Sequence, residues 1–413
     1  MTNGAAPTLP PASLLNGVRV LDLTNVLSGP FCTYQMALLG AEVIKIENPD
    51  GGDLARSLGA SAELNARLMG ASFQAQNAGK KSLAMDLKSD EGRTVFLKLV
   101  RSADVLVENF RPGVMNRLGL GYETLRKENP RLIYTAISGF GQDGPLKSNQ
   151  AYDQIIQGMS GIMSVTGTPE TAPIRVGYPV ADTLGGLTGA FATLAALFAR
   201  GQSGQGQFID VSMLDSSIVS MGWIVSNYLS AGVHPAPLGN ENMTAAPSGT
   251  FMAADGPLNI AANKAEQFVK LSDLLNRPDL PRDPRFAERE TRKRNREALN
   301  AEINAALASN TVAHWVTELT RAGVPAGPVL SIPQVLAHPQ IVSRRLVQDV
   351  GEPDASGQRT RVARAGYRLG DSEPSAQMPP PELGQHTTEI LLSLGLAPTT
   401  IEWFHRQSIV AGQ

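Results

Sequence analysis

The chain has 413 residues, of which 42% are hydrophobic and 18% are charged, and its formal net charge is −2 at pH 7. This length exceeds one ordinary hydrophobic core, so we expect two domains, and the composition excludes a disordered or fibrous protein. A net charge this small gives no reason to expect nucleic acid or an anionic membrane as a partner. The single cysteine, Cys32, excludes an intrachain disulfide framework and a zinc site built from cysteines.

The N-terminal residues 1–13 are rich in Pro, Ala and Thr and lack the basic and apolar segments of a signal peptide. We therefore expect an unstructured lead-in and a cytoplasmic protein. The longest apolar stretch, 184–199, contains several Gly and Thr residues and is shorter than a bilayer span. The five histidines are scattered without metal-ligand spacing, so no metal site is expected.

The first two hundred residues alternate between strand and helix patterns. A strand at 18–23, a short helix at 32–39 and a strand at 41–47 read as a βαβ unit, which implies parallel strands. Further strands are expected at 81–87, 104–108, 132–138 and 207–212, and helices at 89–101, 122–129, 153–163 and 184–200. The fold class is therefore α/β, with an open, Rossmann-like parallel sheet of about six strands.

After residue 212 the pattern changes. The remaining elements are predicted as a helix at 213–231, a Gly/Asn/Pro-rich loop at 235–249, a hairpin at 250–262 turning at Asp255-Gly256, helices at 267–276, 292–309 and 311–322, strand-like patterning at 346–367 and a helix at 387–394. The predicted organisation is a large domain with its N-terminal part at 1–200, a linker helix at 201–225, a smaller α+β domain at 226–328, a linker at 329–339 and the C-terminal part of the large domain at 340–413.

Asp182 is the only charged residue between Arg175 and Arg200. A short apolar run precedes it, a helical pattern follows, and the pattern predicts a strand-to-helix junction. A lone carboxylate there, with the backbone of Gly185 and Gly186 as oxyanion donors, suits a nucleophile. The alternative is that Asp182 only caps the following helix, as Asp often does.

The segment Glu108–Gly113 follows a predicted strand, at the position where α/β proteins bind ligands. Together with Arg117 it offers two guanidinium groups for phosphate, Phe110 for stacking and Asn109 for hydrogen bonding. These groups suit a phosphorylated, adenine-bearing cofactor, and the alternative is a solvated turn with incidental arginines. The segment Gly139–Gly144 matches the dinucleotide-binding pattern, but a proline follows where a helix should begin, which disfavours an NAD-dependent enzyme.

These segments belong to a longer ordered series of motifs: 18–24, 28–30, 39–47, 52–53, 77–82, 108–113, 138–141, 144–145, 151–153, 181–182, 239–240, 253–256, 323–325 and 384–386. The series resembles the class III CoA-transferases, the family of formyl-CoA:oxalate and carnitine CoA-transferases, whose relatives include α-methylacyl-CoA racemases. The likeness runs from about Leu15 to His386 and looks closest to acetyl-CoA or formyl-CoA:oxalate CoA-transferases.

The resemblance assigns roles to particular residues. It implies that Asp182 is the nucleophile and that Tyr152 hydrogen-bonds a small dicarboxylate. A loop at 237–243, with Gly239 and Asn240, would close over the site. The coenzyme A contacts implied by the family are Leu27, Ser28, Asn109, Phe110 and Arg117. No cofactor is expected to be bound permanently, since acyl-CoA is a substrate. The family architecture implies a homodimer of two interlocked rings, with the site between domains of different subunits.

The implied activity is transfer of CoA from acetyl-, formyl- or succinyl-CoA to a small carboxylate, with oxalate favoured. An aspartyl anhydride and an aspartyl-CoA thioester would be the intermediates. A 2-methylacyl-CoA racemase is the alternative within the family, but racemases carry a histidine thirty positions before their aspartate, where this chain has Tyr152. Asn48 stands where some relatives have an arginine near the adenine. From another class, a CoA-binding protein without catalytic activity also fits the motifs.

Overall fold

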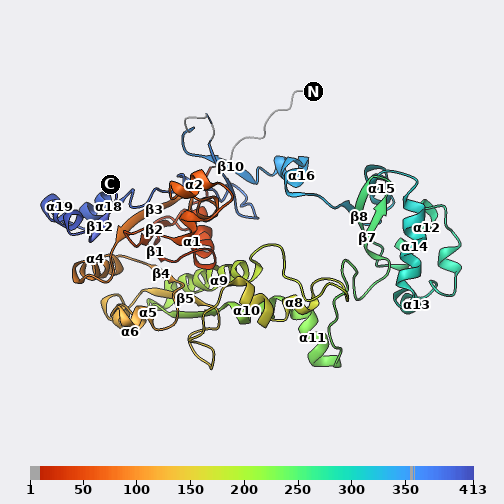
Figure 1. The fold of residues 1–413 in the computed structure, drawn as a ribbon, viewed down its shortest axis with the longest axis horizontal. Helices are drawn as coiled ribbons and strands as arrows, with labels where there is room; N and C mark the ends of the chain where they lie inside the picture. The colour runs from red at the N-terminus through yellow and green to blue at the C-terminus, as the bar shows by residue number, and fades with distance from the viewer. Residues whose placement is uncertain (1–9, 354–356, 358) are drawn as a thin grey trace. The chain divides into compact units, whose positions relative to one another are not determined.

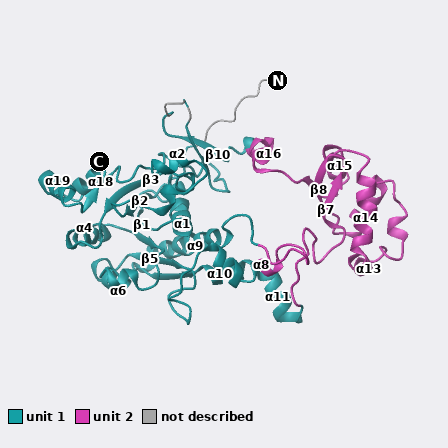
Figure 2. Ribbon diagram, in the orientation of Figure 1, with its two compact units in different colours: residues 1–162, 175–233, 342–413 teal, residues 163–174, 234–341 magenta. Residues whose placement is uncertain are grey.

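The computed structural model describes residues 10–353, 357 and 359–413, so most of the expected lead-in lies outside the described residues. The chain forms two compact units, which Figure 2 colours separately. Unit 1 comprises the chain up to residue 162 together with 175–233 and 342–413, and unit 2 comprises 163–174 and 234–341. The segment 163–174, which we expected in the large domain, thus belongs to unit 2.

Unit 1 is built on a seven-stranded sheet. Its strands are β1 (Arg19–Leu23), β2 (Glu42–Glu47), β3 (Lys80–Met85), β4 (Val105–Glu108), β5 (Ile133–Ser138), β6 (Phe208–Ser212) and β12 (Val410–Ala411). Their order in space is β12-β3-β2-β1-β4-β5-β6, and all pairs are parallel except the edge pair of β12 with β3. The predicted parallel sheet is confirmed. The added strand β12 has two residues, too few to show a pattern.

Helices cover both faces of this sheet (Figure 1). The helices of unit 1 are α1 (Ser28–Leu38), α2 (Ala62–Ala66), α3 (Ala71–Asn77), α4 (Asp90–Arg101), α5 (Val114–Arg117), α6 (Tyr122–Glu128), α7 (Asp153–Met159), α9 (Val180–Ser203), α10 (Met213–Ser220), α11 (Gly222–Ala231), α18 (Thr387–Ser393) and α19 (Pro398–Arg406), with a 3-10 turn η1 (Leu54–Ser57). One core contains residues of α4, α6, α18 and α19, and the other contains residues of α1, α9 and α10. Because both faces are covered, strands β1, β4 and β5 are almost fully buried.

Two expectations about the middle of the chain are wrong. The stretch 201–225 is not a linker helix, because residues 208–212 form β6 at the edge of the main sheet. The helix expected at 213–231 is two helices, α10 and α11, which meet at Met221 and Gly222. Glycine has a low helix propensity, and the hydrophobic pattern alone does not reveal the interruption.

By length and composition alone, α9 is the one helix in the described part of the chain that is apolar enough to cross a membrane. It packs against α1, α7, α10, β5 and β6 within unit 1. Its residues Ala181, Gly189, Ala190 and Thr193 are buried against these neighbours. Cys32 is fully buried in the same layer.

Unit 2 contains a three-stranded antiparallel sheet of β7 (Ser248–Ala253), β8 (Gly256–Ala261) and β9 (Ala326–Pro328). The predicted hairpin is confirmed, although its turn falls one residue earlier, at Ala254 and Asp255. The remaining helices from the middle of the chain are α8 (Ile162–Val165), α12 (Ala265–Leu274), α13 (Arg289–Arg294), α14 (Arg296–Leu307), α15 (Val312–Arg321), α16 (Ile332–Ala337) and α17 (Pro339–Ser343), with a 3-10 turn η2 (Leu280–Arg282). A two-stranded sheet of β10 (Val347–Val350) and β11 (Thr360–Ala363) belongs to unit 1.

Candidate active site

Unit 1 contains a cavity of about 280 Å³ at the carboxyl ends of its central strands. The loops after β1, β4 and β5, together with the end of β5, form most of its wall. The strand β1 pairs with β2 on one side and with β4 on the other, so the chain order reverses between β1 and β4. Such a reversal leaves a crevice between the neighbouring loops, and open α/β sheets bind their ligands there.

The cavity brings together residues from distant parts of the sequence. The residues that the sequence singled out and that line it are Leu27, Ser28, Asn109, Phe110, Tyr152 and Asp182. Arg117 does not line it, because it lies on the exposed side of the short helix α5. Gly239 and Asn240 belong to unit 2, where they line a groove of about 600 Å³ beside β7 and β8.

Asp182 lies in the first turn of α9 but does not cap it. The N-cap residue is Pro179, which has no side-chain acceptor. The neighbouring carboxylate of Asp153 fulfils that function: its Oδ1 accepts hydrogen bonds from the N–H of Ala181 at 2.8 Å and of Asp182 at 3.4 Å. No strand leads into α9 within 163–179, so the expected strand-to-helix junction is a turn followed by a helix.

Asp153 is itself held by α7 and the segment before α9. Gln157, one turn further along α7, donates from Nε2 to Asp153 Oδ2 at 2.6 Å. The Oε1 of Gln157 accepts from the N–H of Val176 at 2.8 Å. The start of α9 is therefore fixed by buried side chains of another helix. The Asp182 carboxylate lines the cavity and does not cap the helix.

The electrostatic environment of Asp182 disfavours its charge. Burial, followed by repulsion from Asp153, raises the pKa of the Asp182 carboxyl from 3.8 to about 7. None of the described residues donates a hydrogen bond to this carboxylate. A half-buried carboxylate without protein donors, in the wall of a cavity, is free to react with a bound molecule.

Gly185 and Gly186 lie inside α9, where main-chain N–H groups bond to carbonyls one turn earlier. They are therefore not free oxyanion donors, as we had expected from their position. Instead they allow α9 to approach α1. A Cβ atom added at Gly186 would lie 2.5 Å from the carbonyl oxygen of Ser28, and one at Gly185 would lie 2.8 Å from Met213 Cγ.

Two of the lining residues present unused polar groups. Ser28 is buried, and its Oγ has no hydrogen-bond partner among the described residues. It begins α1, whose N-cap Leu27 supplies no side-chain acceptor. Tyr152 is 66% exposed, so its ring is not merely packed in the core. The Tyr152 side chain is open to solvent, whereas the unpaired Ser28 Oγ is covered and lies beside Gly185 of α9.

Asn109 has a more specific role than the sequence indicated. Its Oδ1 accepts from the N–H of Asn25 at 2.8 Å, and its Nδ2 donates to the carbonyl of Asn25 at 2.8 Å. The side-chain amide therefore joins the loop after β1 to the loop after β4. Its contribution to a ligand site is to hold two parts of the wall together.

The cavity is also lined by Lys147, which the sequence did not indicate, and by Arg111, one of the two guanidinium groups that the sequence offered for phosphate. Arg111 and Lys147 are its lining cations, and both suit a polyanionic ligand such as a nucleotide diphosphate. Arg111 lies within the segment that we singled out, so a signal for it existed. Lys147 lies in a polar loop whose path depends on tertiary contacts, and nothing in the local pattern distinguishes it. No group of three or more His, Cys, Asp or Glu side chains in the described part of the chain is arranged to hold a metal ion.

The model of CoA-transferase family III matches residues 15–387. The chain is 41% identical to an acetyl-CoA:oxalate CoA-transferase of Acetobacter aceti, over 89% of this chain and 93% of that protein. It is 37% identical to a succinate–glutarate CoA-transferase of Agrobacterium fabrum, over 92% of this chain and 95% of that protein.

The fold of the chain also matches a solved structure. The crystal structure of a CAIB/BAIF family protein from Brucella suis superposes with a TM-score of 0.82 at 35% sequence identity, covering 93% of this chain and 100% of that chain. The family match extends over both units and includes every lining residue of the cavity. The chain belongs to CoA-transferase family III and is a transferase enzyme.

Proposed function

We propose that this enzyme transfers CoA from a short acyl-CoA to a small carboxylate, with oxalate the favoured acceptor, and that Asp182 is its nucleophile. The observation that carries the proposal is that Asp182, whose carboxyl pKa is raised, lines the same cavity at the strand reversal as the cations Arg111 and Lys147. The choice of oxalate draws on the relative from Acetobacter aceti, which is named for acetyl-CoA and oxalate. Glutarate and mesaconate are named for other relatives and are the competing acceptors.

The proposed reaction has four balanced steps. The Asp182 carboxylate attacks the thioester carbonyl, and the C–S bond breaks to give a mixed anhydride and CoA thiolate. The thiolate attacks the aspartyl carbonyl, which releases the donor acid and leaves an aspartyl-CoA thioester. The acceptor carboxylate attacks this thioester, expelling thiolate and forming a second anhydride. The thiolate then attacks the acceptor acyl carbonyl, which yields the new acyl-CoA and restores Asp182.

The surroundings of Asp182 suit these steps. Because none of the residues that the structure describes donates a hydrogen bond to the carboxylate, its lone pairs are not engaged before substrate binds. The Ser28 side chain, buried and without a partner, is a candidate donor to the oxyanion that forms on either carbonyl. Tyr152, exposed at the rim, is the candidate to hydrogen-bond the acceptor. Arg111 and Lys147 would bind the phosphates of CoA, and Leu27 and Phe110 would line its path.

We propose that the active form is a homodimer, in the cytoplasm and without a membrane or nucleic-acid partner. Large exposed apolar side chains on the neighbouring helices α9, α10 and α11 support the homodimer, since exposed apolar side chains that gather on one surface indicate a partner. Those more than 70% exposed are Phe191, Phe198, Val219, Trp223 and Leu229. Gly239 and Asn240, in their groove of unit 2, are proposed to contact substrate from the partner subunit's copy of that unit.

The test combines a substrate panel with trapping of the intermediate. Acyl-CoA donors are mixed with small carboxylates, and the CoA products are identified by mass spectrometry. Hydroxylamine or borohydride added during turnover should modify Asp182 alone. The Asp182→Ala variant should lose transfer and still bind CoA, and Asp215→Ala, an exposed aspartate on α10, is the matched control. Modification of a different residue, or near-normal turnover by Asp182→Ala, would refute the assignment.

Two measurements distinguish this enzyme from a racemase and from a CoA-binding protein without catalytic activity. A racemase would exchange the α-proton of a 2-methylacyl-CoA with heavy water, and we expect no exchange because Tyr152 replaces the histidine. A CoA-binding protein without catalytic activity would bind CoA and transfer it to none of the carboxylates.

A further inference from the structure

Six of the almost completely buried charged side chains of unit 1 pair with one another. They are Asp22, Lys45, Glu47, Asp53, Arg56 and Lys80. They form three ion pairs: Lys45 Nζ with Asp53 Oδ2 at 2.9 Å, Arg56 Nε with Glu47 Oε1 at 2.7 Å, and Lys80 Nζ with Asp22 Oδ2 at 2.9 Å. Removing charges from water offsets most of the attraction within such a pair, so buried ion pairs add little net stability. Their presence calls for another explanation.

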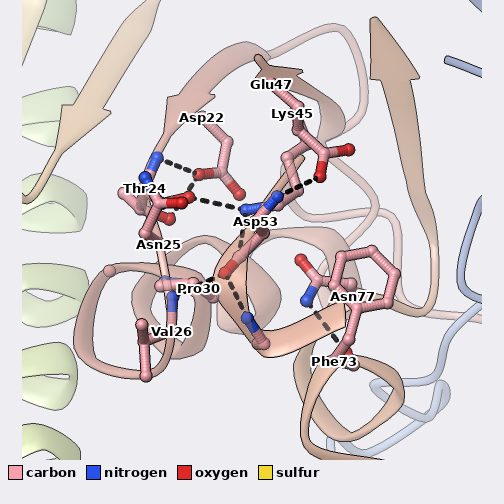
Figure 3. Close-up of polar contacts among 12 residues, drawn as sticks. Asp22, Thr24, Asn25, Val26, Pro30, Lys45, Glu47, Asp53, Phe73 and Asn77 are labelled. Atoms are coloured by element: carbon pink, nitrogen blue, oxygen red, sulfur yellow. Dashed lines mark hydrogen bonds and ion pairs between the residues drawn. The ribbon is translucent and has the colours of Figure 1, made fainter. Parts of the chain in front are cut away.

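The explanation lies in the loop that follows β1. Its main-chain groups are bonded one after another by buried side chains, several of which Figure 3 shows. The N–H of Thr24 donates to Asp22 Oδ1 at 2.9 Å, and the carbonyl of Thr24 accepts from Lys45 Nζ at 2.7 Å. The N–H of Val26 donates to Asp53 Oδ1 at 2.9 Å.

Between these two points, Asn25 is held on both its N–H and its carbonyl by Asn109. Each main-chain hydrogen bond described for Thr24, Asn25 and Val26 therefore ends on a side chain. The partners are Asp22 two residues earlier, Lys45 of β2, Asn109 after β4 and Asp53 after β2. Residues 24–27 have no regular secondary structure to fix their path, so these bonds determine where Asn25 and Leu27 lie in the cavity wall before α1 begins at Ser28.

The backbone of this loop is also strained. Val26 has a φ of +67°, in the left-handed region that a β-branched residue rarely adopts. Such a conformation persists only where surrounding contacts impose it, and it is concentrated at functional sites. The Val26 N–H is held by Asp53, which in turn is held by Lys45.

We propose that Lys45 and Asp53 are positioning residues for the acyl-CoA site, which hold the loop from Thr24 to Ser28 in its strained shape. Neither residue lines the cavity. Their effect on the ligand passes through the main chain of Thr24 and Val26. The part of this inference that concerns CoA rests on the proposed function, while the part that concerns the loop does not.

The ionisation of the pair supports this role. Burial raises the pKa of the Asp53 carboxyl, but Lys45 and the N–H groups of Val26 and Ala55 outweigh it, so the pKa is lowered overall. Burial lowers the pKa of Lys45, but the carboxylates of Asp22, Asp53 and Glu47 outweigh it, so the pKa is raised overall. Both residues are therefore charged at neutral pH and hold the loop in that state.

The ion pair of Arg56 with Glu47 offers a matched control. Arg56 is as deeply buried as Lys45, but its remaining bonds go to the carbonyls of Leu68 at 3.2 Å and Pro381 at 3.1 Å, outside the cavity wall. The Arg56→Met and Lys45→Met variants each remove one buried cation and leave one buried carboxylate. They should lose similar stability, and they differ in whether the lost cation contacts the loop.

The experiment compares four variants, Lys45→Met, Asp53→Ala, Asp53→Asn and Arg56→Met, in the full-length protein well below their melting temperatures. Calorimetry measures the Kd for CoA. We expect Lys45→Met and Asp53→Ala to weaken binding about tenfold or more, and Arg56→Met to change it less than about threefold. Asp53→Asn keeps an acceptor for the Val26 N–H and should fall in between.

Hydrogen exchange measures the loop directly. Peptides covering residues 23–31 should exchange faster in Lys45→Met and Asp53→Ala than in Arg56→Met, whereas a purely structural role would accelerate all three alike. Equal weakening by Lys45→Met and Arg56→Met, or unchanged exchange and Kd in folded Asp53→Ala, would overturn the inference. If the wild-type protein fails to bind CoA, the proposed function fails, and the exchange comparison still decides whether Lys45 and Asp53 position the loop. Where Lys45→Met or Asp53→Ala does not fold, Asp53→Asn against Arg56→Met gives the same comparison.

Discussion

Replacing Asp182 with Asn should make the protein more stable above pH 7 and inactive at every pH. The side chain keeps its size and loses only its charge. Burial and then repulsion from Asp153 raise the pKa of this carboxyl from 3.8 to about 7 in the folded protein. Between these two values the folded protein binds more protons than the unfolded chain, so the free energy of unfolding falls as pH rises.

The magnitude follows from the shift. A difference of about 3 pKa units corresponds to at most about 4 kcal/mol. Because the carboxylate faces a cavity that water enters, we expect about 2 kcal/mol. The destabilisation is absent below about pH 4, grows through pH 5 and 6, and is complete above pH 7. The stability difference between Asp182→Asn and the wild type should follow the same curve.

Two assays read the same ionisation. Urea denaturation at intervals from pH 4 to pH 8 gives the stability difference, and kcat/KM for acyl-CoA in the wild type should rise about tenfold per unit below pH 6 and level off above pH 8. Asp153→Asn should move that midpoint to lower pH, because it removes the second cause of the shift. A flat pH–rate profile from pH 5 to 8, or an Asp182→Asn variant less stable than the wild type at pH 8, would refute this reasoning.

Further predictions concern residues that support the site. Burial raises the pKa of Glu108 to about 7. The Glu108→Gln variant keeps an acceptor for the N–H of Phe110, so it should raise the free energy of unfolding by about 1–3 kcal/mol at pH 8 and by almost nothing at pH 4. A loss of stability at pH 8 in urea denaturation would contradict this prediction. Gly186→Ala should destabilise the protein by about 1–3 kcal/mol in thermal denaturation, because the new Cβ would lie 2.5 Å from a carbonyl oxygen of α1. Gly201→Ala, at an open position of α9, should stabilise by up to about 1 kcal/mol, and equal effects of the two alanines would disprove the packing argument.

Local patterns predicted much of unit 1. The alternation of buried strands with amphipathic helices such as α4 depends on neighbours two to four positions apart, so it can be read from the chain. The parallel sheet and the hairpin in unit 2 were predicted on that basis and are confirmed. The breaks at Met221 and Asn295 and the short strands β9 and β12 were not predicted, because they are too brief to leave a pattern.

The candidate site was likewise predicted from the sequence only in part. Asp182 stands out in the sequence as a lone carboxylate, and the strand ends near Leu27 and Asn109 point to a ligand site. The sequence left open whether Asp182 caps its helix. The structure shows that Asp153, from α7, is the acceptor at the start of α9.

The sequence by itself determined which residues are candidates for the chemistry and most of the strands and helices around them, because side-chain type and local periodicity are properties of the chain. Tertiary structure decided which of those residues meet. The bonds from Asn109 to Asn25 and from Asp53 to Val26 join segments that no local pattern links. They depend on the order of β2, β1 and β4 in the sheet, and that order is set when the whole core packs.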